Sequence, residues 1–321
     1  MKVQNNPVNL ITMATPFPVG PVNVYLIKED PITLIDAGPN LPNSEEYLEA
    51  YLDSMGVQFK DIKRLIITHA HPDHIGLASR IQELSGAEVF LHEQEIEKLI
   101  LQNPAASERA GLLRQAGIPG DVVEQLAQWN KENRSRFMTK LDMNTVIPLK
   151  GKETFGFQSG KLELIFTPGH SPGHICLYDP ERKFLFSGDH ILANISPNPL
   201  LELAPGGQGR SKSLLQYLDS LRKVTQKPLE MVYPGHGSPF SDYPEALDRF
   251  YHYFRQREEA VFQLVGQQGK TAYEVSYELY PDMQGVDIFL GVSKAMGHLD
   301  LLVDEGRVRE TEVDGILYFS N

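Results

Sequence analysis

The sequence is poor in cysteine and has no long apolar segment. Cys176 is the single cysteine among 321 residues, which rules out an internal disulfide and a cysteine-based zinc site. It lies in an apolar run without a basic neighbour, so we expect a buried strand thiol rather than a reactive one. No run reaches the roughly 20 apolar residues that span a bilayer. The N-terminus also lacks a basic stretch followed by an apolar one, and we expect a soluble cytoplasmic protein without membrane association.

Positive charge is also scarce. The 30 lysines and arginines are outnumbered by 42 aspartates and glutamates, and the formal net charge is −12. Long-range attraction to nucleic acid is therefore unfavourable, although a local basic groove is compatible with this composition. The hydrophobic content of 41% is ordinary for a globular protein. The length suits one large domain and a smaller one.

One short segment carries a dense group of metal-ligand side chains. A short apolar run predicts a buried strand, and His69, His71, Asp73 and His74 follow it directly. Side chains alternate along an extended chain, so His69 and His71 point the same way. Asp73 and His74 lie past the bend at Pro72, which suits the start of a helix. Imidazoles and carboxylates bind transition metals, so this segment can serve two adjacent ions. The alternative is a polar loop with chance histidines.

Three later strands end in a similar way, with glycine before a ligand-type residue. The pairs are Gly169–His170, Gly188–Asp189 and Gly235–His236, each after a short apolar run. Glycine allows the backbone to approach an ion closely. We therefore expect four strand ends to meet at one edge of a sheet and to form a single cleft.

With these motifs the sequence resembles the metallo-β-lactamase superfamily over roughly the first three quarters of the chain, including every metal-ligand motif. The resemblance implies an α/β fold, a four-layer αββα sandwich, with two divalent metal ions. One ion would be held by His69, His71 and His170, the other by Asp73, His74 and His236, with Asp189 bridging the two. Asp36, after the strand 32–35, matches the aspartate that supports a ligand histidine in the family. Its alternative role is that of an ordinary turn residue.

Two ions a few ångströms apart would lower the pKa of a shared water and give a hydroxide nucleophile at neutral pH. Asp73 would orient this hydroxide, and Asp36 would fix a ligand histidine. His190 would either face the substrate as a proton donor, which we favour, or bond to a neighbouring loop. His174 is expected to begin a strand and to be structural. The donor set favours Zn²⁺, although Fe or Mn also tolerate it.

The rest of the pattern divides the chain into a catalytic domain over 1–242, with a helical insertion at about 92–139, and a winged-helix-like domain over 243–321. The insertion is expected either to cover one wall of the cleft or to act as a remote buttress. We expect a helix capped by Asn43 and Glu46 and one continuous helix from Pro72 to Gly86. The expected strands are 9–14, 22–27, 32–35, 65–67, 88–91, 145–149, 162–166, 174–178, 183–186 and 231–233. The expected helices of the insertion are 93–101 and 121–129, and those of the C-terminal region are 243–265, 272 onward and 287–304, followed by a hairpin of 308–312 and 316–320.

Four functions fit the resemblance to different degrees. True β-lactamases usually lack a bridging aspartate, so Asp189 favours the glyoxalase II, lactonase and nuclease-like branches. Hydrolysis of an ester, thioester or lactone is the first hypothesis, and phosphodiester cleavage of RNA is the alternative. A di-iron redox role is disfavoured because the flavodoxin domain that is fused in such relatives is absent from this sequence. A non-catalytic binding protein would be expected to lack a ligand residue, and none is missing here.

The charge of the C-terminal module bears on its partners. From Arg257 onward it carries five basic residues against twelve acidic ones, and duplex binding needs several cations. DNA binding by this module is therefore disfavoured, and packing or a homodimer contact is expected instead. The expected partner of the site is a small-molecule substrate.

Overall fold

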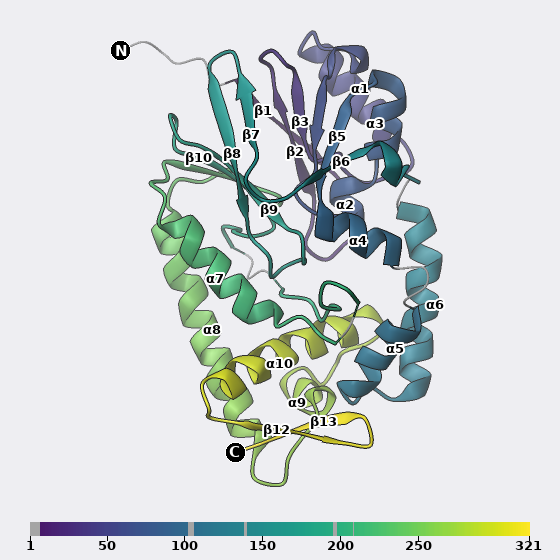
Figure 1. The fold of residues 1–321 in the computed structure, drawn as a ribbon, viewed down its shortest axis with the longest axis vertical. Helices are drawn as coiled ribbons and strands as arrows, with labels where there is room; N and C mark the ends of the chain where they lie inside the picture. Colours follow the sequence, from purple (N-terminus) through teal and green to yellow (C-terminus); the bar gives the residue numbers. More distant parts are fainter. Residues whose placement is uncertain (1–6, 102–105, 138–139, 195–197, 208) are drawn as a thin grey trace.

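The computed structural model describes residues 7–101, 106–137, 140–194, 198–207 and 209–321. Two β-sheets lie face to face in the upper part of the molecule (Figure 1). The first has six strands, in the spatial order β1 (Val8–Met13), β2 (Val22–Ile27), β3 (Thr33–Ile35), β4 (Arg64–Ile66), β5 (Glu88–His92) and β6 (Val146–Leu149). The second has five, in the order β11 (Met231–Pro234), β10 (Phe184–Gly188), β9 (Ile175–Asp179), β8 (Gly160–Phe166) and β7 (Thr154–Phe157).

The strands follow the apolar runs of the sequence closely. β1, β2 and β3 are antiparallel, and β3, β4, β5 and β6 run parallel. Every residue of β2 is buried, as is typical of a strand covered on both faces. The expected strands are confirmed with small shifts at their ends, and Cys176 is buried in β9 as expected. β7 was not expected, because its four residues include Gly156 and carry little strand signal.

Helices cover the outer faces of both sheets. Leu48 of α1 (Ser44–Ser54) and Ile81 of α3 (Ala78–Ser85) pack on the first sheet. Tyr217 of α7 (Ser213–Thr225) and Phe254 of α8 (Tyr243–Val265) pack on the second. Between the sheets lies a third cluster, formed by Tyr25, Ile35, Ile66, Leu177, Phe186 and their neighbours. The order helices, sheet, sheet, helices is the αββα sandwich that the family resemblance implied.

Two local predictions about helices are wrong. Asn43 stands at the N-cap of α1 but has φ 66°, and its side chain makes no capping hydrogen bond. The helix expected to run from Pro72 is divided into α2 (Pro72–Ile75) and α3. At the break between α2 and α3, the backbone bonds to a neighbouring loop instead of continuing the helix. Leu77 N donates to Gly38 O at 3.2 Å. A Cβ on Gly76 would lie 2.4 Å from Asn40 N, so glycine is required where the two segments touch.

The C-terminal region contains α8, α9 (Ala272–Leu279), α10 (Val286–Asp304) and the hairpin β12 (Arg309–Val313) and β13 (Ile316–Ser320). These are the expected three helices and hairpin. The capping box of α9 is present, with Thr271 N donating to Glu274 Oε2 at 2.8 Å and Glu274 N donating to Thr271 Oγ1 at 3.2 Å. Asp314 and Gly315 both have positive φ, as a tight hairpin turn requires. None of the helices in the described ranges is long and apolar enough to cross a membrane.

The described residues of the insertion form three helices, α4 (Glu93–Leu101), α5 (Ala106–Gln115) and α6 (Gly120–Phe137). α5 was not expected, and α6 is longer than predicted. Leu112, Leu113 and Val123 of α5 and α6 share one core with Val292 and Leu299 of α10. α5 lies beside one end of α10 (Figure 1). α5 and α6 therefore buttress the C-terminal module. Two 3₁₀ turns, Phe59–Asp61 and Met143–Thr145, complete the described elements.

We expect Leu299→Ala to lower the free energy of unfolding by ~2–5 kcal/mol, because truncating a fully buried leucine leaves a cavity. Leu299 is 0% exposed in the core that joins the insertion to α10. Urea unfolding followed by the fluorescence of Trp129, which lies in α6, measures the change. Val313→Ala is the matched control, since Val313 is 54% exposed and such changes stay within about 0.5 kcal/mol. Equal stability of the two variants would contradict the shared core.

Candidate metal centre

The structure brings all seven predicted ligand-type side chains together. They come from the segment after β4, which includes α2, from the ends of β10 and β11, and from the turn after β8. Three groups have ligand atoms that all lie within 4.8 Å of one another, and each group could hold a metal ion. The groups are His69, His71 and His170; His69, His74 and Asp189; and Asp73, His74 and His236. Because the groups share residues, they form one continuous cluster.

The first group consists of three imidazoles whose nitrogens face one another. His71 Nδ1 lies 2.9 Å from His69 Nε2 and 3.0 Å from His170 Nε2. Bonds of 2.0–2.1 Å to a tetrahedral Zn²⁺ would separate such nitrogens by about 3.3 Å. Only a small movement therefore separates the observed arrangement from that of a metal site.

Asp189 lies between the group of His69, His71 and His170 and the group of Asp73, His74 and His236. Its Oδ1 is 3.4 Å from His74 Nε2, and its Oδ2 is 3.5 Å from both His170 Nε2 and His236 Nε2. His236 Nε2 is also 3.4 Å from Asp73 Oδ2. His74 Nε2, His236 Nε2 and Asp189 Oδ1 are buried and have no hydrogen-bond partner among the described residues. Buried polar atoms normally have a partner, so a cation among these atoms fits the arrangement.

Four of the histidines are fixed through the opposite ring nitrogen. His69 Nδ1 bonds to Thr68 Oγ1 at 3.1 Å, and His74 Nδ1 bonds to Asp36 Oδ2 at 2.8 Å. His170 Nδ1 bonds to the backbone oxygen of Asn198 at 3.2 Å, and His236 Nδ1 bonds to that of Pro21 at 2.8 Å. These bonds turn each Nε2 toward the centre of the cluster, as the outer partners of metal-binding histidines do.

Asp36 has more contacts than a turn residue needs. Besides His74 it accepts hydrogen bonds from Thr68 N at 2.7 Å and from Thr68 Oγ1 at 2.9 Å. Its backbone has φ 63°, an uncommon conformation for a residue other than glycine. The carboxylate thus fixes both the start of the ligand segment and one of its imidazoles.

The electrostatics divide the histidines into two classes. Burial lowers the pKa of His69, His71 and His170, and the charges of neighbouring histidines and of Lys98 add to this effect. These rings are therefore neutral at pH 7 and have free lone pairs. Burial also disfavours the charged forms of His74 and His236, but nearby carboxylates, Asp189 above all, outweigh it. They raise the pKa of His74 and raise that of His236 to about 9.

Glu95 is a site residue that the sequence analysis missed. It lies in the first turn of α4 and is fully buried. Its carboxylate accepts hydrogen bonds from Ala70 N at 2.9 Å, from Gly173 N at 2.7 Å and from Ser171 Oγ. Glu95 therefore ties the His69–His71 segment to the loop of His170. An acid at the start of a helix is the only local signal, because its partners lie far away in the sequence.

Lys98, one turn after Glu95, was also missed. Its Nζ lies 2.9 Å from Glu202 Oε1 and donates to Ser171 Oγ at 3.2 Å. Lys98 and Glu202 are both largely buried. Through α4 the insertion thus contacts the ligand loops, while α5 and α6 pack on the C-terminal module. The packing of α5 and α6 fits the expected role of a buttress, and the covering of a cleft wall by the insertion stays a prediction.

His174 and His190 lie outside the cluster. His174 Nδ1 bonds to Thr167 Oγ1 at 2.8 Å, and its Nε2 accepts from Asp189 N at 3.2 Å, in keeping with the expected structural role. His190 is fully buried, with its ring centroid 4.7 Å from that of Tyr217. Burial, followed by the charge of His170, lowers the pKa of His190 to about 3. The structure therefore places a neutral ring against α7, where we had favoured a substrate-facing proton donor.

Comparisons with known proteins agree with this geometry. The model of the family described as the metallo-beta-lactamase superfamily matches residues 17–236. A Bacillus subtilis (strain 168) protein named probable metallo-hydrolase YqjP is 33% identical over 323 residues, which cover 96% of each chain. A metallo-beta-lactamase family protein of Thermus thermophilus has a crystal structure with a TM-score of 0.80 and 28% identity, covering 98% of each chain. Thioesterase pkgB of Emericella nidulans is 22% identical over 244 residues, covering 76% of this chain and 54% of that protein.

We expect Asp36→Asn to weaken the binding of divalent metal by about 10–100-fold, the usual effect of losing such an outer partner. The carboxylate accepts three hydrogen bonds, and an amide has one oxygen to accept them. Metal content after dialysis against a graded chelator, measured by mass spectrometry, gives the affinity. Asp282→Asn, at an exposed position, is the control and should keep its metal. Retention of wild-type affinity by Asp36→Asn would show that Asp36 does not support the site.

Proposed function

Because this chain belongs to the metallo-beta-lactamase superfamily, we propose that it is a metal-dependent hydrolase with two divalent ions that cleaves an ester, thioester or lactone. The observation that carries the proposal is the meeting of seven histidine and aspartate side chains in overlapping groups. A single ion needs only one such group. The group of His69, His71 and His170 and the group of Asp73, His74 and His236 share no residue. Asp189 lies between them, and this arrangement favours a pair of ions.

The residues divide naturally between the two ions. His69, His71 and His170 would hold one ion through neutral imidazoles. Asp73, His74 and His236 would hold the other, and Asp189 would contact both. Five imidazoles and two carboxylates form a donor set that favours Zn²⁺, and Fe or Mn also tolerate it.

Each step of the reaction would use side chains of the cluster and of its surroundings. Bound divalent ions would supply an acidified water and would polarise the scissile carbonyl. Asp73 would accept a hydrogen bond from this water and direct it toward the carbonyl carbon. Asp36 positions His74, and Glu95 keeps the two ligand loops in register. Burial of the histidine side chains would limit bulk water around the reacting atoms, which would strengthen these electrostatic effects.

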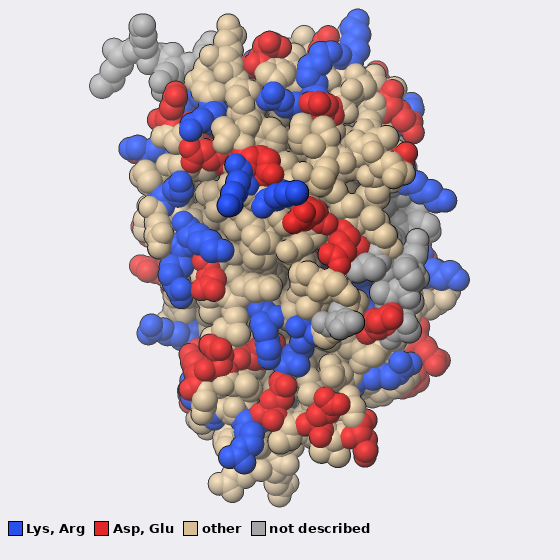
Figure 2. All heavy atoms as spheres, in the orientation of Figure 1, with Lys and Arg blue, Asp and Glu red and all other residues tan. Residues whose placement is uncertain are grey.

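Two observations favour a carbonyl substrate over RNA. The relative pkgB is named a thioesterase, and the chain carries a formal charge of −12. On the face shown in Figure 2, basic and acidic side chains are interspersed, whereas a nucleic-acid backbone needs several unopposed cations. The alternative is a phosphodiesterase or endoribonuclease with the same pair of ions. A binding protein without catalysis is disfavoured because every predicted ligand residue is present in the cluster.

A substrate panel tests the proposal on the Zn²⁺-loaded protein. The panel contains S-lactoylglutathione and other acyl thioesters, an acyl-homoserine lactone, bis-p-nitrophenyl phosphate and a short single-stranded RNA. We expect turnover of at least one carbonyl substrate. Asp189→Ala should lose both turnover and bound metal, because it removes the carboxylate shared by the two groups, whereas Asp282→Asn should keep both. Activity confined to the phosphate ester and RNA would overturn the carbonyl proposal in favour of the alternative.

Metal binding should release protons at one site only. At pH 7 the lowered pKa values leave His69, His71 and His170 neutral, so an ion entering there displaces no proton from them. His236 has its pKa raised to about 9, so it is protonated at pH 7 and must lose that proton to bind. We therefore expect proton release with one of two bound ions and a rise in the affinity for that ion as pH increases toward about 9. Calorimetric titrations in two buffers of different ionisation enthalpy measure the number of protons released with each bound ion. Two proton-free binding steps at pH 7 would contradict the assignment.

A further inference from the structure

One segment contacts both the metal cluster and the C-terminal module. It consists of residues 198–203, which lie between β10 and α7 and belong to no helix or named strand. We call it the connecting segment. All of its residues are buried or half-buried, whereas chain without regular secondary structure normally runs over the surface. The connecting segment is therefore held by contacts on both of its sides.

On the side of the metal cluster, the connecting segment holds the loop of His170 at two points. The backbone oxygen of Asn198 lies 3.2 Å from His170 Nδ1. Because a carbonyl oxygen can only accept, this bond places the ring proton on Nδ1 and leaves the lone pair of Nε2 free for an ion. At the other end of the segment, Glu202 Oε1 lies 2.9 Å from Lys98 Nζ. The same Nζ donates to Ser171 Oγ at 3.2 Å, directly after His170 in the chain.

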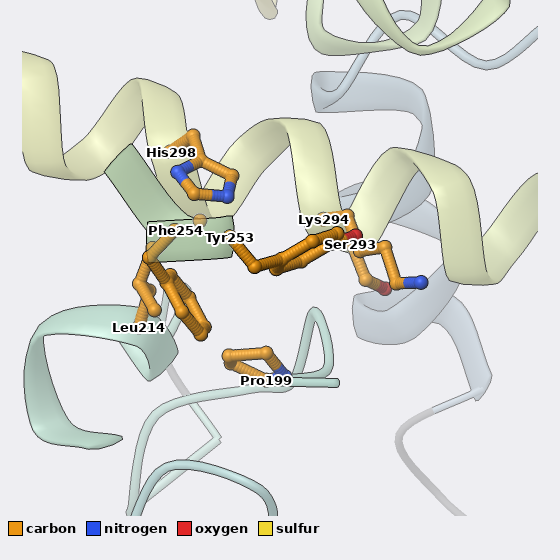
Figure 3. Close-up of a pocket in the computed structure, with 8 residues that line it drawn as sticks. Pro199, Leu214, Tyr253, Phe254, Ser293, Lys294 and His298 are labelled. Carbon is orange, nitrogen blue, oxygen red and sulfur yellow. The ribbon is translucent and has the colours of Figure 1, made fainter. Parts of the chain in front are cut away.

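On its other side, the connecting segment is attached to α10. Asn198 Nδ2 donates to Leu290 O at 3.4 Å, and Leu201 N donates to Ser293 Oγ at 3.0 Å. The side chain of Leu201 belongs to the core that α5, α6 and α10 share. Pro199 and Ser293 line one small cavity (Figure 3). Since Leu290 and Ser293 are three residues apart, the segment follows one face of α10.

His170 differs in this respect from the other histidines of the cluster. The outer partners of His69 and His74 are Thr68 and Asp36, which follow β4 and β3 of the first sheet. The outer partner of His236 is Pro21, directly before β2 of the same sheet. The outer partner of His170 is instead bonded to α10. A shift of α10 would therefore act on His170 and leave the other three rings in place.

We propose that the C-terminal module sets the orientation of His170 through the connecting segment, and thereby sets the affinity of the protein for one of its two ions. Asn198 and Ser293 are positioning residues in this role, because each acts through His170. The inference rests on the function proposed above only in taking His170 as a ligand of one ion. When the attachment to α10 is weakened, the ring of His170 turns more freely. An entering ion then has to order this ring, which lowers the affinity.

Exchange of ring protons with water tests the proposal in the Zn²⁺-loaded full chain labelled with ¹⁵N-histidine. The Nδ1–H signals of His170 and His236 are followed by NMR in the same sample, and His236 is the internal reference because its partner is Pro21. Ser293→Ala removes the acceptor of Leu201 N. We expect exchange at His170 to become at least about tenfold faster, in keeping with the loss of a buried hydrogen bond. Exchange at His236 should stay unchanged.

Ser276→Ala is the matched control. Ser276 is also a buried serine in a helix of the C-terminal module, and its Oγ donates to Tyr273 O at 2.7 Å. Ser293 Oγ donates to Phe289 O at the same distance. The control should therefore lose a similar bond within its helix and keep both exchange rates. Asn198→Ala, which removes the other bond to α10, is the second variant and should act as Ser293→Ala does.

The affinity for Zn²⁺ is the second readout, measured by competition with a chelator. Ser293→Ala and Asn198→Ala should each bind one ion about tenfold or more weakly, in the range known for outer partners of metal ligands. The other ion should be bound as in the wild type, and Ser276→Ala should keep both affinities. Urea unfolding confirms that each variant is folded.

Two results would overturn the proposal. One is an unchanged exchange rate at His170 in both Ser293→Ala and Asn198→Ala. The other is an equal acceleration at His170 and His236, since that would indicate a general loosening of the structure. Neither measurement uses a substrate. A protein that binds two Zn²⁺ ions with these effects and hydrolyses nothing in the panel would contradict the proposed reaction alone and would support the positioning role.

Discussion

The fold depends on keeping the carboxylate of Asp189 inside the protein. An isolated buried charge is strongly unfavourable, and it is tolerated only with opposite charges and hydrogen bonds around it. Here, burial would raise the pKa of Asp189, but the charges of His74 and His236 hold it well below its usual range. Asp189 and His236 follow β10 and β11 of the second sheet, and His74 lies in α2, which follows β4 of the first sheet. The charges that stabilise the Asp189 carboxylate therefore come together only when the two sheets meet at the same edge.

Hydrogen bonds between distant parts of the chain join the loops at that edge. Glu95 joins the His69–His71 segment to the loop of His170. Pro21 fixes His236, and Asn198 fixes His170 while bonding to α10. Each ligand loop thus has a partner from a distant part of the chain. Such fixed outer partners set ring orientation before any ion binds, which reduces the reorganisation that binding requires.

The sequence predicted the parts of the molecule that depend on local patterns. Apolar runs marked the strands, glycines before histidine or aspartate marked the strand ends, and the Thr271–Glu274 capping box marked α9. Predictions failed where distant contacts decide the structure. The helix after Pro72 is broken because Leu77 bonds to Gly38, and Asn43 adopts a left-handed conformation without capping. Glu95 and the buried position of His190 could not be found locally, since their neighbours are close only in the folded chain.

The core shared by α5, α6 and α10 determines how the protein can be divided into fragments. A fragment ending before α8 would retain every histidine and aspartate of the cluster. It would also leave the apolar faces of Leu112, Leu113 and Val123 uncovered, because the residues that cover them belong to the C-terminal module. Exposed apolar patches of this kind promote aggregation. α5, α6 and the C-terminal module therefore form one exchangeable unit, and a chimera with a related protein would have to transfer them together.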